Sequence, residues 1–215
     1  MAFAFHQDLA QEQLLRPFLD RTYVTHGIRC KRSTDLEDQR QGIDLWLCKD
    51  GYRYAVDEKA QLHYIGHSLP TFAFEVDLLH SGEQRPGWLF DPTKRTEVYA
   101  LVFDIMLMED RSELRSEADI ASVEVVLVNR SRLINHLLKA GLSAELLQRM
   151  ADELRATGDR TRTVQPPGVR LVASPQLTEC PVNLLLTRRF LCTIGQVLRS
   201  TGDQPSANGV SQRES

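Results

Sequence analysis

The stretch from Gln41 to Gln61, QGIDLWLCKDGYRYAVDEKAQ, determines the fold that we expect of this chain. Two runs rich in aliphatic, aromatic and β-branched residues flank the dipeptide Asp50-Gly51. A two-residue type I′ turn needs a positive φ at both central positions, and Asp-Gly meets that need. The stretch therefore predicts a β-hairpin with Asp50 and Gly51 at its tip.

The predicted turn fixes which residues face one another across the two strands. Counting outward pairs Lys49 with Tyr52. At the open end the same count pairs Asp44 with Asp57. Because side chains alternate between the faces of a strand, one face carries the polar residues Asp44, Asp57, Lys59 and Gln61. The other face carries the apolar residues Ile43, Leu45, Leu47, Tyr54, Val56, Ala60 and Leu62. We expect the apolar face to be core and the polar face to carry chemistry.

The two opposed acids predict a cation site. Directly paired β-carbons lie about 5 Å apart, and like charges at that spacing destabilise a sheet unless something lies between them. A hard divalent cation such as Mg²⁺ or Mn²⁺ takes carboxylate oxygens and would supply that compensation. Lys59 lies about 6.6 Å further along the strand than Asp57. Its amine can hold or activate a water, or meet charge that develops on a phosphate.

At these residues the chain resembles the PD-(D/E)XK nuclease superfamily. The pattern of that superfamily is an acid on one strand, a short hairpin, and then Asp or Glu, any residue, and Lys on the next strand. Asp44 matches the first acid, Asp57 the second and Lys59 the lysine. The resemblance covers residues 42–61 and elsewhere rests on the order of elements. It implies a restriction-endonuclease-like α/β fold, with a mixed central β-sheet flanked by helices, and a Mg²⁺- or Mn²⁺-dependent nuclease that hydrolyses phosphodiester bonds, with DNA as the expected substrate.

The resemblance also assigns roles outside the triplet. Gln61 lies where many members carry a polar helper, so we expect it to orient water or phosphate. The backbone carbonyl of Glu58 is expected to be a further metal ligand. Members often bring a helical Glu to the metal, and Glu12, on the apolar side of a helix predicted over residues 7–22, is the candidate. An exposed acid that favours the helix dipole is the other interpretation of Glu12. Pro17 should kink or interrupt that helix.

Glu58 departs from the pattern, because the middle residue of the triplet is usually apolar and points into the core. A buried carboxylate without a partner is costly, so either that end of the apolar face is open or a basic residue meets Glu58. A three-residue turn over residues 49–51 is the alternative register. It would place Glu58, and not Asp57, on the side of Asp44. We prefer the two-residue turn because it gathers more apolar residues on one face.

Three further residues are candidates for substrate binding. Lys31 and Arg32 belong to a basic cluster just before the hairpin, which indicates either a phosphate clamp or a solvated run of charges. Trp88 belongs to an aromatic run over residues 87–92, which indicates either a surface on which bases stack or a lid over the core.

Length and composition set the limits for these expectations. With 215 residues and 42% hydrophobic content, the chain can bury one sizeable core, so we predict a single domain over residues 1–200 and a disordered polar tail over 201–215. A net charge of −3 excludes proteins that coat nucleic acid through bulk charge. The four cysteines lack metal-site spacing, which argues against structural zinc.

The same limits apply to location and partners. No run of about 18 apolar residues and no signal-like start occurs, so we expect a cytoplasmic protein without a membrane partner. Nucleic acid, above all DNA, is the expected partner, and a homodimer is one option for assembly. A second hypothesis is a catalytically silent nuclease-fold module that binds nucleic acid or a partner protein. Its acids and Lys59 would then form only a surface ion-pair cluster.

Hydrophobic periodicity predicts the remaining elements. Strands are expected over residues 71–79, 96–107, 122–128 and 169–173. Helices are expected over residues 131–139, 144–156 and 183–198. Polar loops are expected over residues 33–41, 80–86 and 160–167.

Overall fold

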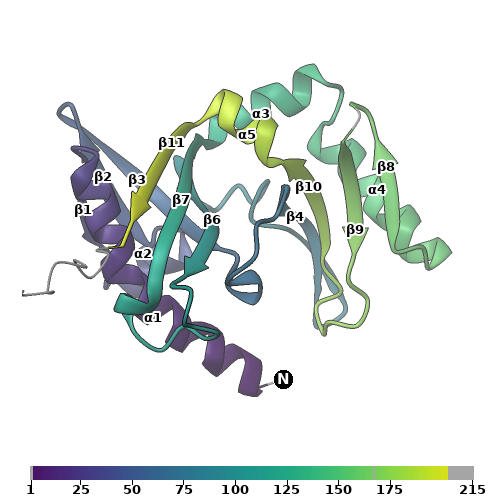
Figure 1. Ribbon diagram of the computed structural model, residues 1–215. Coiled ribbons are helices and arrows are strands. Elements are labelled where there is room, and N and C mark those ends of the chain that lie inside the picture. Colours follow the sequence, from purple (N-terminus) through teal and green to yellow (C-terminus); the bar gives the residue numbers. More distant parts are fainter. Residues whose placement is uncertain (1, 167, 203–215) are drawn as a thin grey trace, which may run out of the picture.

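The chain forms a mixed α/β structure with two β-sheets (Figure 1). This computed structural model describes the backbone of residues 2–166 and 168–202 and the side chains from Leu9 onward. The first sheet has the order β1 (Arg29–Arg32), β2 (Leu45–Lys49), β3 (Tyr52–Ala60), β6 (Val98–Leu107), β7 (Ile120–Asn129) and β11 (Gln196–Thr201). The second sheet has the order β5 (Glu83–Pro86), β4 (Thr71–His80), β10 (Val182–Thr187), β9 (Val169–Ala173) and β8 (Thr161–Val164).

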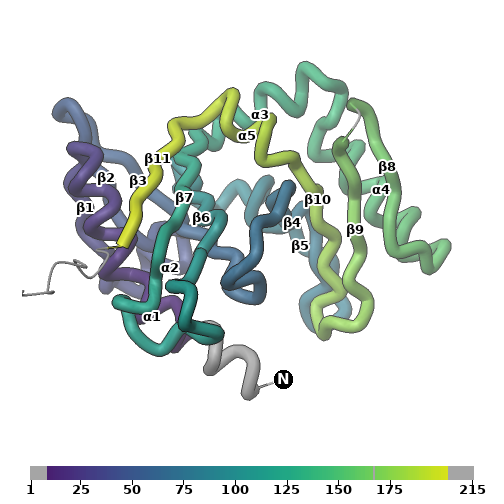
Figure 2. The backbone as a smooth tube through the Cα atoms, in the orientation of Figure 1, coloured from purple at the N-terminus to yellow at the C-terminus, as the bar shows by residue number. Residues whose placement is uncertain are grey.

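The first sheet is mixed and curled. Strands β3 and β6 pair in parallel, whereas β1 with β2, β2 with β3, β6 with β7 and β7 with β11 pair antiparallel. Parallel neighbours need a crossover, which is usually a helix. Here the chain leaves the first sheet after β3, forms β4 and β5 in the second sheet and returns as β6, as the tube in Figure 2 shows. The two sheets are therefore joined next to the hairpin.

The predicted hairpin is confirmed, with Asp50 at φ 52° and Gly51 at φ 82°. The paired residues are Lys49 with Tyr52, Leu47 with Tyr54 and Leu45 with Val56. A two-residue turn is therefore correct, and the alternative three-residue register is wrong.

Helix α1 (Ala2–Thr25) covers one face of the first sheet. Its buried side chains recur at helical spacing and pack on the apolar face of the hairpin; they are Leu15, Phe18, Leu19 and Tyr23. The helix continues through Pro17, so the predicted interruption is wrong. Proline removes one backbone hydrogen bond, but buried side chains on both sides of Pro17 hold the helix against the sheet.

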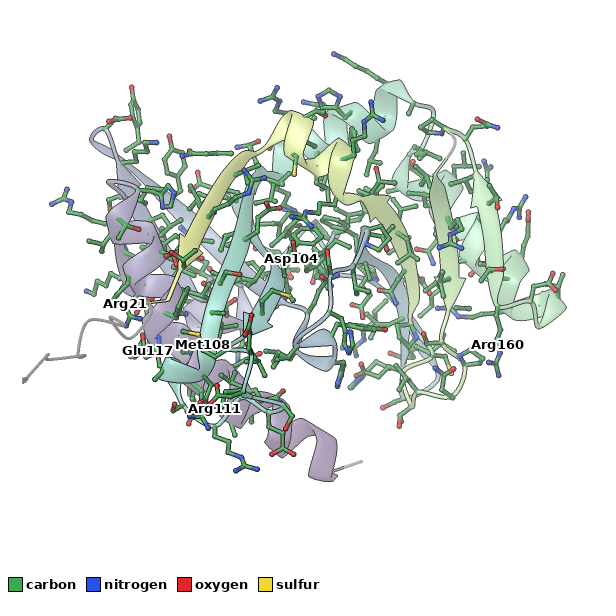
Figure 3. The ribbon with its side chains drawn as sticks, in the orientation of Figure 1. Arg21, Asp104, Met108, Arg111, Glu117 and Arg160 are labelled. Atoms are coloured by element: carbon green, nitrogen blue, oxygen red, sulfur yellow. The ribbon has the colours of Figure 1, made fainter. Side chains whose placement is uncertain are left out.

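The other face of the first sheet packs on the second sheet. Aromatic residues of β4 and β6, namely Phe72, Phe74, Tyr99 and Phe103, form the centre of this layer. Helices α3 (Arg130–Lys139) and α4 (Ala144–Thr157) join the same core and confirm two predicted helices. Helix α3 lies beside α5 (Arg188–Ile194) where the two sheets meet (Figure 1). Asp104 also lies in the middle of the molecule, while Arg160 lies near its outer edge (Figure 3).

The helix predicted over residues 183–198 is confirmed only over α5, and the rest of the prediction is wrong, because the segment also contains all but the first residue of β10 and the start of β11. Val182, Leu184 and Leu186 are buried in strict alternation, and β10 pairs with β4 on one side and β9 on the other. A leucine-rich run suits either period, and here pairing with two neighbouring strands decides for the strand.

Three predicted loops also contain regular structure. Residues 80–86 include β5 and residues 160–167 include β8, which are the two edge strands of the second sheet. Residues 33–41 include the short helix α2 (Leu36–Arg40). The four predicted strands are confirmed within two residues as β4, β6, β7 and β9. The predicted disordered tail lies outside the described residues from position 203 onward. Among the described helices, none combines the length and hydropathy that crossing a membrane requires.

Candidate functional site

The polar face of the hairpin brings three predicted residues together. Asp57 and Lys59 project from β3, and Asp44 lies directly before β2. The Nζ atom of Lys59 lies 2.8 Å from Oδ1 of Asp57. The Oδ2 atom of Asp44 accepts a hydrogen bond of 2.9 Å from the backbone N–H of Glu58. This bond holds the Asp44 carboxylate across the strands from Asp57.

Asp57 is 3% exposed. Burial and the neighbouring Asp44 carboxylate raise the pKa of Asp57, the Lys59 ammonium opposes them, and the net result is a pKa of about 6. Its Oδ1 atom is buried, and the Lys59 ammonium 2.8 Å away is the cationic group that offsets its charge. Buried carboxylate oxygens normally have such a partner, and a metal ion bound at Oδ1 would share this oxygen with Lys59.

Lys59 carries a positive charge at this position. Burial alone would lower the pKa of its ammonium group, but the carboxylates of Asp57, Asp44 and Glu12 outweigh burial and raise that pKa. The ammonium group lies 5.6 Å from the ring centroid of Trp88, within the range of a cation–π contact.

These residues line a cleft of about 620 Å³, which we call the main cleft. The hairpin supplies one wall, and the turn over residues 91–94 and the β4–β5 hairpin supply the others. The lining side chains that can bind an ion or a substrate, or take part in a reaction, include Asp44, Asp57, Lys59, Glu75, Arg85 and Trp88. The predicted Trp88 thus lies in the same cleft as the acids and the lysine.

Glu75 is a cleft residue that sequence reasoning missed. It lies on β4, and its carboxylate accepts a hydrogen bond from the backbone N–H of Trp88, while burial raises its pKa. Gly87 packs so closely that an added Cβ would lie 2.4 Å from the backbone carbon of Glu75. The alternation of residues 71–79 marks Glu75 as facing away from Phe74, but no sequence signal shows that this strand of the other sheet approaches the hairpin.

A second cavity of about 190 Å³, which we call the side pocket, lies toward α1. Asp44 and Lys59 line both cavities. Glu12 lines the side pocket, and its Oε2 atom lies 3.7 Å from the Nη2 atom of Arg16. Burial raises the pKa of the Glu12 carboxyl group. The predicted helical acid therefore reaches Asp44 and Lys59 from the side of α1, whereas Asp57 lines the main cleft.

Glu58 points to the α1 side of the sheet, where a basic residue meets it. Arg32 donates to its Oε1 atom at 2.9 Å, and the Tyr23 hydroxyl donates to Oε2 at 2.6 Å. Arg32 is also paired with Asp20. The carboxylate of Glu58 and the guanidinium of Arg32 are thus engaged with each other. Lys31 is exposed on β1 and lines neither cavity.

Gln61 does not join the acids. Its Nε2 atom donates to the backbone carbonyl of Thr71 at 2.8 Å, and the residue lines neither the main cleft nor the side pocket. Strand β3 ends at Ala60, so the alternation that placed Gln61 on the polar face no longer applies.

The acids suit some metal ions better than others. Among the side chains that the structure describes, which begin at Leu9, no three of His, Cys, Asp or Glu are grouped as a ready metal site. Magnesium usually keeps several waters and takes one or two carboxylates together with substrate phosphates. The pair Asp44 and Asp57, with the buried Oδ1 atom of Asp57, fits that mode of binding.

Comparisons of the chain with protein-family models, with curated proteins and with solved structures found no match.

Proposed function

We propose that the main cleft is the active site of a metal-dependent nuclease of the PD-(D/E)XK type. The observation that carries this proposal is the convergence of Asp44, Asp57 and Lys59 on one wall of a cleft, in the order acid, hairpin, acid and lysine. The mixed first sheet and the helix α1 on one of its faces are compatible with a restriction-endonuclease-like arrangement.

Asp44 and Asp57 would hold Mg²⁺ or Mn²⁺, and the superfamily resemblance adds the backbone carbonyl of Glu58. When bound, the ion would polarise a phosphoryl oxygen and make a water more acidic. Glu12 and Gln61 lie apart from the Asp57 side of the site. We therefore assign neither of them a direct contact with the reacting phosphate.

Lys59 donates to the attacking water and faces the negative charge that grows on the phosphoryl oxygens. Preorganised charge of this kind stabilises the transition state without the need to reorganise solvent. The water oxygen forms a bond to phosphorus while the bond to the leaving sugar oxygen breaks in line. Glu75 is a carboxylate in the same cleft with a raised pKa, so it can accept the proton of the water. The leaving oxygen takes a proton from solvent.

The first test is DNA cleavage by a Lys59→Ala variant with Mn²⁺. We expect the variant to keep its fold and its thermal stabilisation by Mn²⁺ but to lose cleavage by roughly 10² to 10³ or more, because a preorganised donor to the transition state is lost. Supercoiled, linear and branched DNA serve as substrates, and Lys31→Ala is the control because Lys31 is exposed and outside both cavities. Undiminished cleavage by Lys59→Ala would refute the role of this lysine.

One observation favours a second candidate, a silent nuclease-fold module that binds nucleic acid or a partner protein. Lys59 is already paired with Asp57, so the two residues can serve as a structural ion pair. Thermal unfolding separates the two candidates. A metal enzyme gains stability with Mg²⁺ or Mn²⁺ by mass action, and a silent module does not.

A further inference from the structure

We infer that the main cleft takes a single strand of nucleic acid and excludes an intact duplex. This inference rests on the proposed function and specifies its substrate, namely single-stranded regions such as free ends and flaps.

The depth of the reactive groups is the first reason. The Asp57 side chain is only 5% exposed although it lines the cleft, so a phosphate reaches it only when its strand enters the cleft. The cleft volume of about 620 Å³ lies within the range of small-molecule sites, about 300 to 1,000 Å³. A duplex is wider than its own major groove of about 12 Å, so only a strand that has left the duplex can enter a cleft of this volume.

The walls of the cleft are pinned on both sides. On one side, the ammonium group of Lys94 donates to the carbonyl of Arg40 at 2.8 Å, and the Thr96 hydroxyl donates to the carbonyl of Gly42 at 2.7 Å. On the other side, the N–H of Gly87 donates to the carbonyl of Val76 at 2.9 Å. These bonds tie the turn over residues 91–94 to the segment before Asp44 and tie Trp88 to β4. The cleft is therefore formed before any ligand arrives and is not a gap between free loops.

The lining chemistry is the second reason. The indole ring of Trp88 is held by ring contacts with Phe74 at 5.2 Å and Tyr99 at 5.0 Å, while Pro86 and Pro92 line the same cleft. Arg85, on the exposed edge strand β5, adds a positive charge. Aromatic surfaces with nearby cations bind single strands, because unpaired bases offer their faces for stacking. Bases within a duplex keep those faces covered.

The test measures binding without cleavage. The chain has two tryptophans, so Trp46→Phe leaves Trp88 as the only indole reporter. In EDTA, a single-stranded oligonucleotide should quench Trp88 fluorescence and bind about tenfold or more tightly than a blunt duplex of the same sequence, the equivalent of one stacked base. Anisotropy of a dye-labelled oligonucleotide with the unmodified protein gives the same comparison without relying on the Trp46→Phe fold.

Arg85→Ala should weaken single-strand binding severalfold, because a phosphate contact is lost. Arg160→Ala is the matched control, since Arg160 is exposed and precedes β8 at the edge of the second sheet opposite β5 (Figure 3). Equal affinity for duplex and single strand, or equal effects of the two arginine variants, would overturn the inference.

Cleavage assays then separate the two proposals. If the protein cuts a covalently closed relaxed duplex as fast as a single strand, the cleft inference fails and the nuclease proposal stands. If single strands bind as expected but no DNA or RNA is cut with Mn²⁺, the nuclease proposal fails, and the cleft remains a single-strand site of a silent module.

Discussion

At the scale of single residues, Asp57 places a carboxyl group in the main cleft, but its ionised form lowers the stability of the fold. Its ordinary pKa of 3.8 rises to about 6 in the folded protein, so the folded state binds the proton more tightly than the unfolded state. The stability that this proton supplies is fully present below about pH 4 and is lost as the pH rises through about 6. Above that pH, ionised Asp57 destabilises the metal-free fold.

Asp57→Asn should therefore raise the unfolding midpoint of the metal-free protein at pH 8, because an amide needs no ionisation in a buried place. A shift of about two pKa units sets an upper limit of roughly 3 kcal/mol on the gain. Urea unfolding in EDTA at pH 8 and pH 5 measures it, and the gain should shrink at pH 5. Adding Mn²⁺ should stabilise only the unmodified protein. If Asp57→Asn is less stable than the parent protein at pH 8, then ionised Asp57 does not destabilise the metal-free fold.

The sequence predicted the convergence of Asp44, Asp57 and Lys59 because a two-residue turn and strand alternation are local rules. Those rules stop where the strand stops, which is why Gln61 was placed on the wrong neighbours. They also carry no information on partners from distant elements. Glu75 in the second sheet therefore escaped prediction.

At the scale of elements, the leucine-rich segment before α5 shows how strand pairing overrides an ambiguous pattern. The sequence over residues 182–187 has no charged residue and no turn signal, so its helical and strand interpretations have similar support. Burial in the structure follows a period of two, with Leu184 fully buried and Leu185 only half-buried. Hydrogen bonds from β4 and β9 fix that period.

Two neighbouring substitutions test this period. Leu184→Ala should destabilise the protein by about 2 to 5 kcal/mol, because it empties a core site. Leu185→Ala, on the other face of the strand, should cost clearly less. Denaturant unfolding of both variants, checked for an unchanged slope, compares the two costs. Equal losses of stability would mean that the side chains of β10 do not alternate between the core and the surface.

At the scale of the whole molecule, charge limits how the protein can hold nucleic acid. The net charge is −3, and the basic side chains that line the main cleft are Lys59, Arg85 and Lys94. Each phosphate contact on a single strand contributes about −0.7 to the slope of log affinity against log salt. Binding should therefore be local and only mildly sensitive to salt.

Anisotropy titrations of a single-stranded oligonucleotide between 50 and 200 mM salt should give a slope of about −2, as expected for three phosphate contacts. Arg85→Ala should reduce that slope by about one contact, while Arg160→Ala should leave it unchanged. A slope steeper than about −4 would indicate an extended basic surface away from the main cleft.

The α/β class is confirmed and the mixed first sheet agrees with what the superfamily resemblance implies, whereas the second sheet is not predicted. Its strands come from residues 71–86 and 161–187, and pairing between such distant segments leaves no mark in local periodicity. The two edge strands, β5 and β8, are short and polar. Such segments look like loops until the strand beside them is known.

The position of β10 has a consequence for how the protein folds while the ribosome is synthesising it. Strand β10 lies between β4 and β9 and holds the two halves of the second sheet together, and β11 forms the edge of the first. Chains are made from the N-terminus, so the wall with Asp44 and Lys59 can fold early, while the opposite wall on β4 waits for residues 182–187 to emerge. A nascent chain therefore carries the acidic hairpin well before it carries a finished cleft.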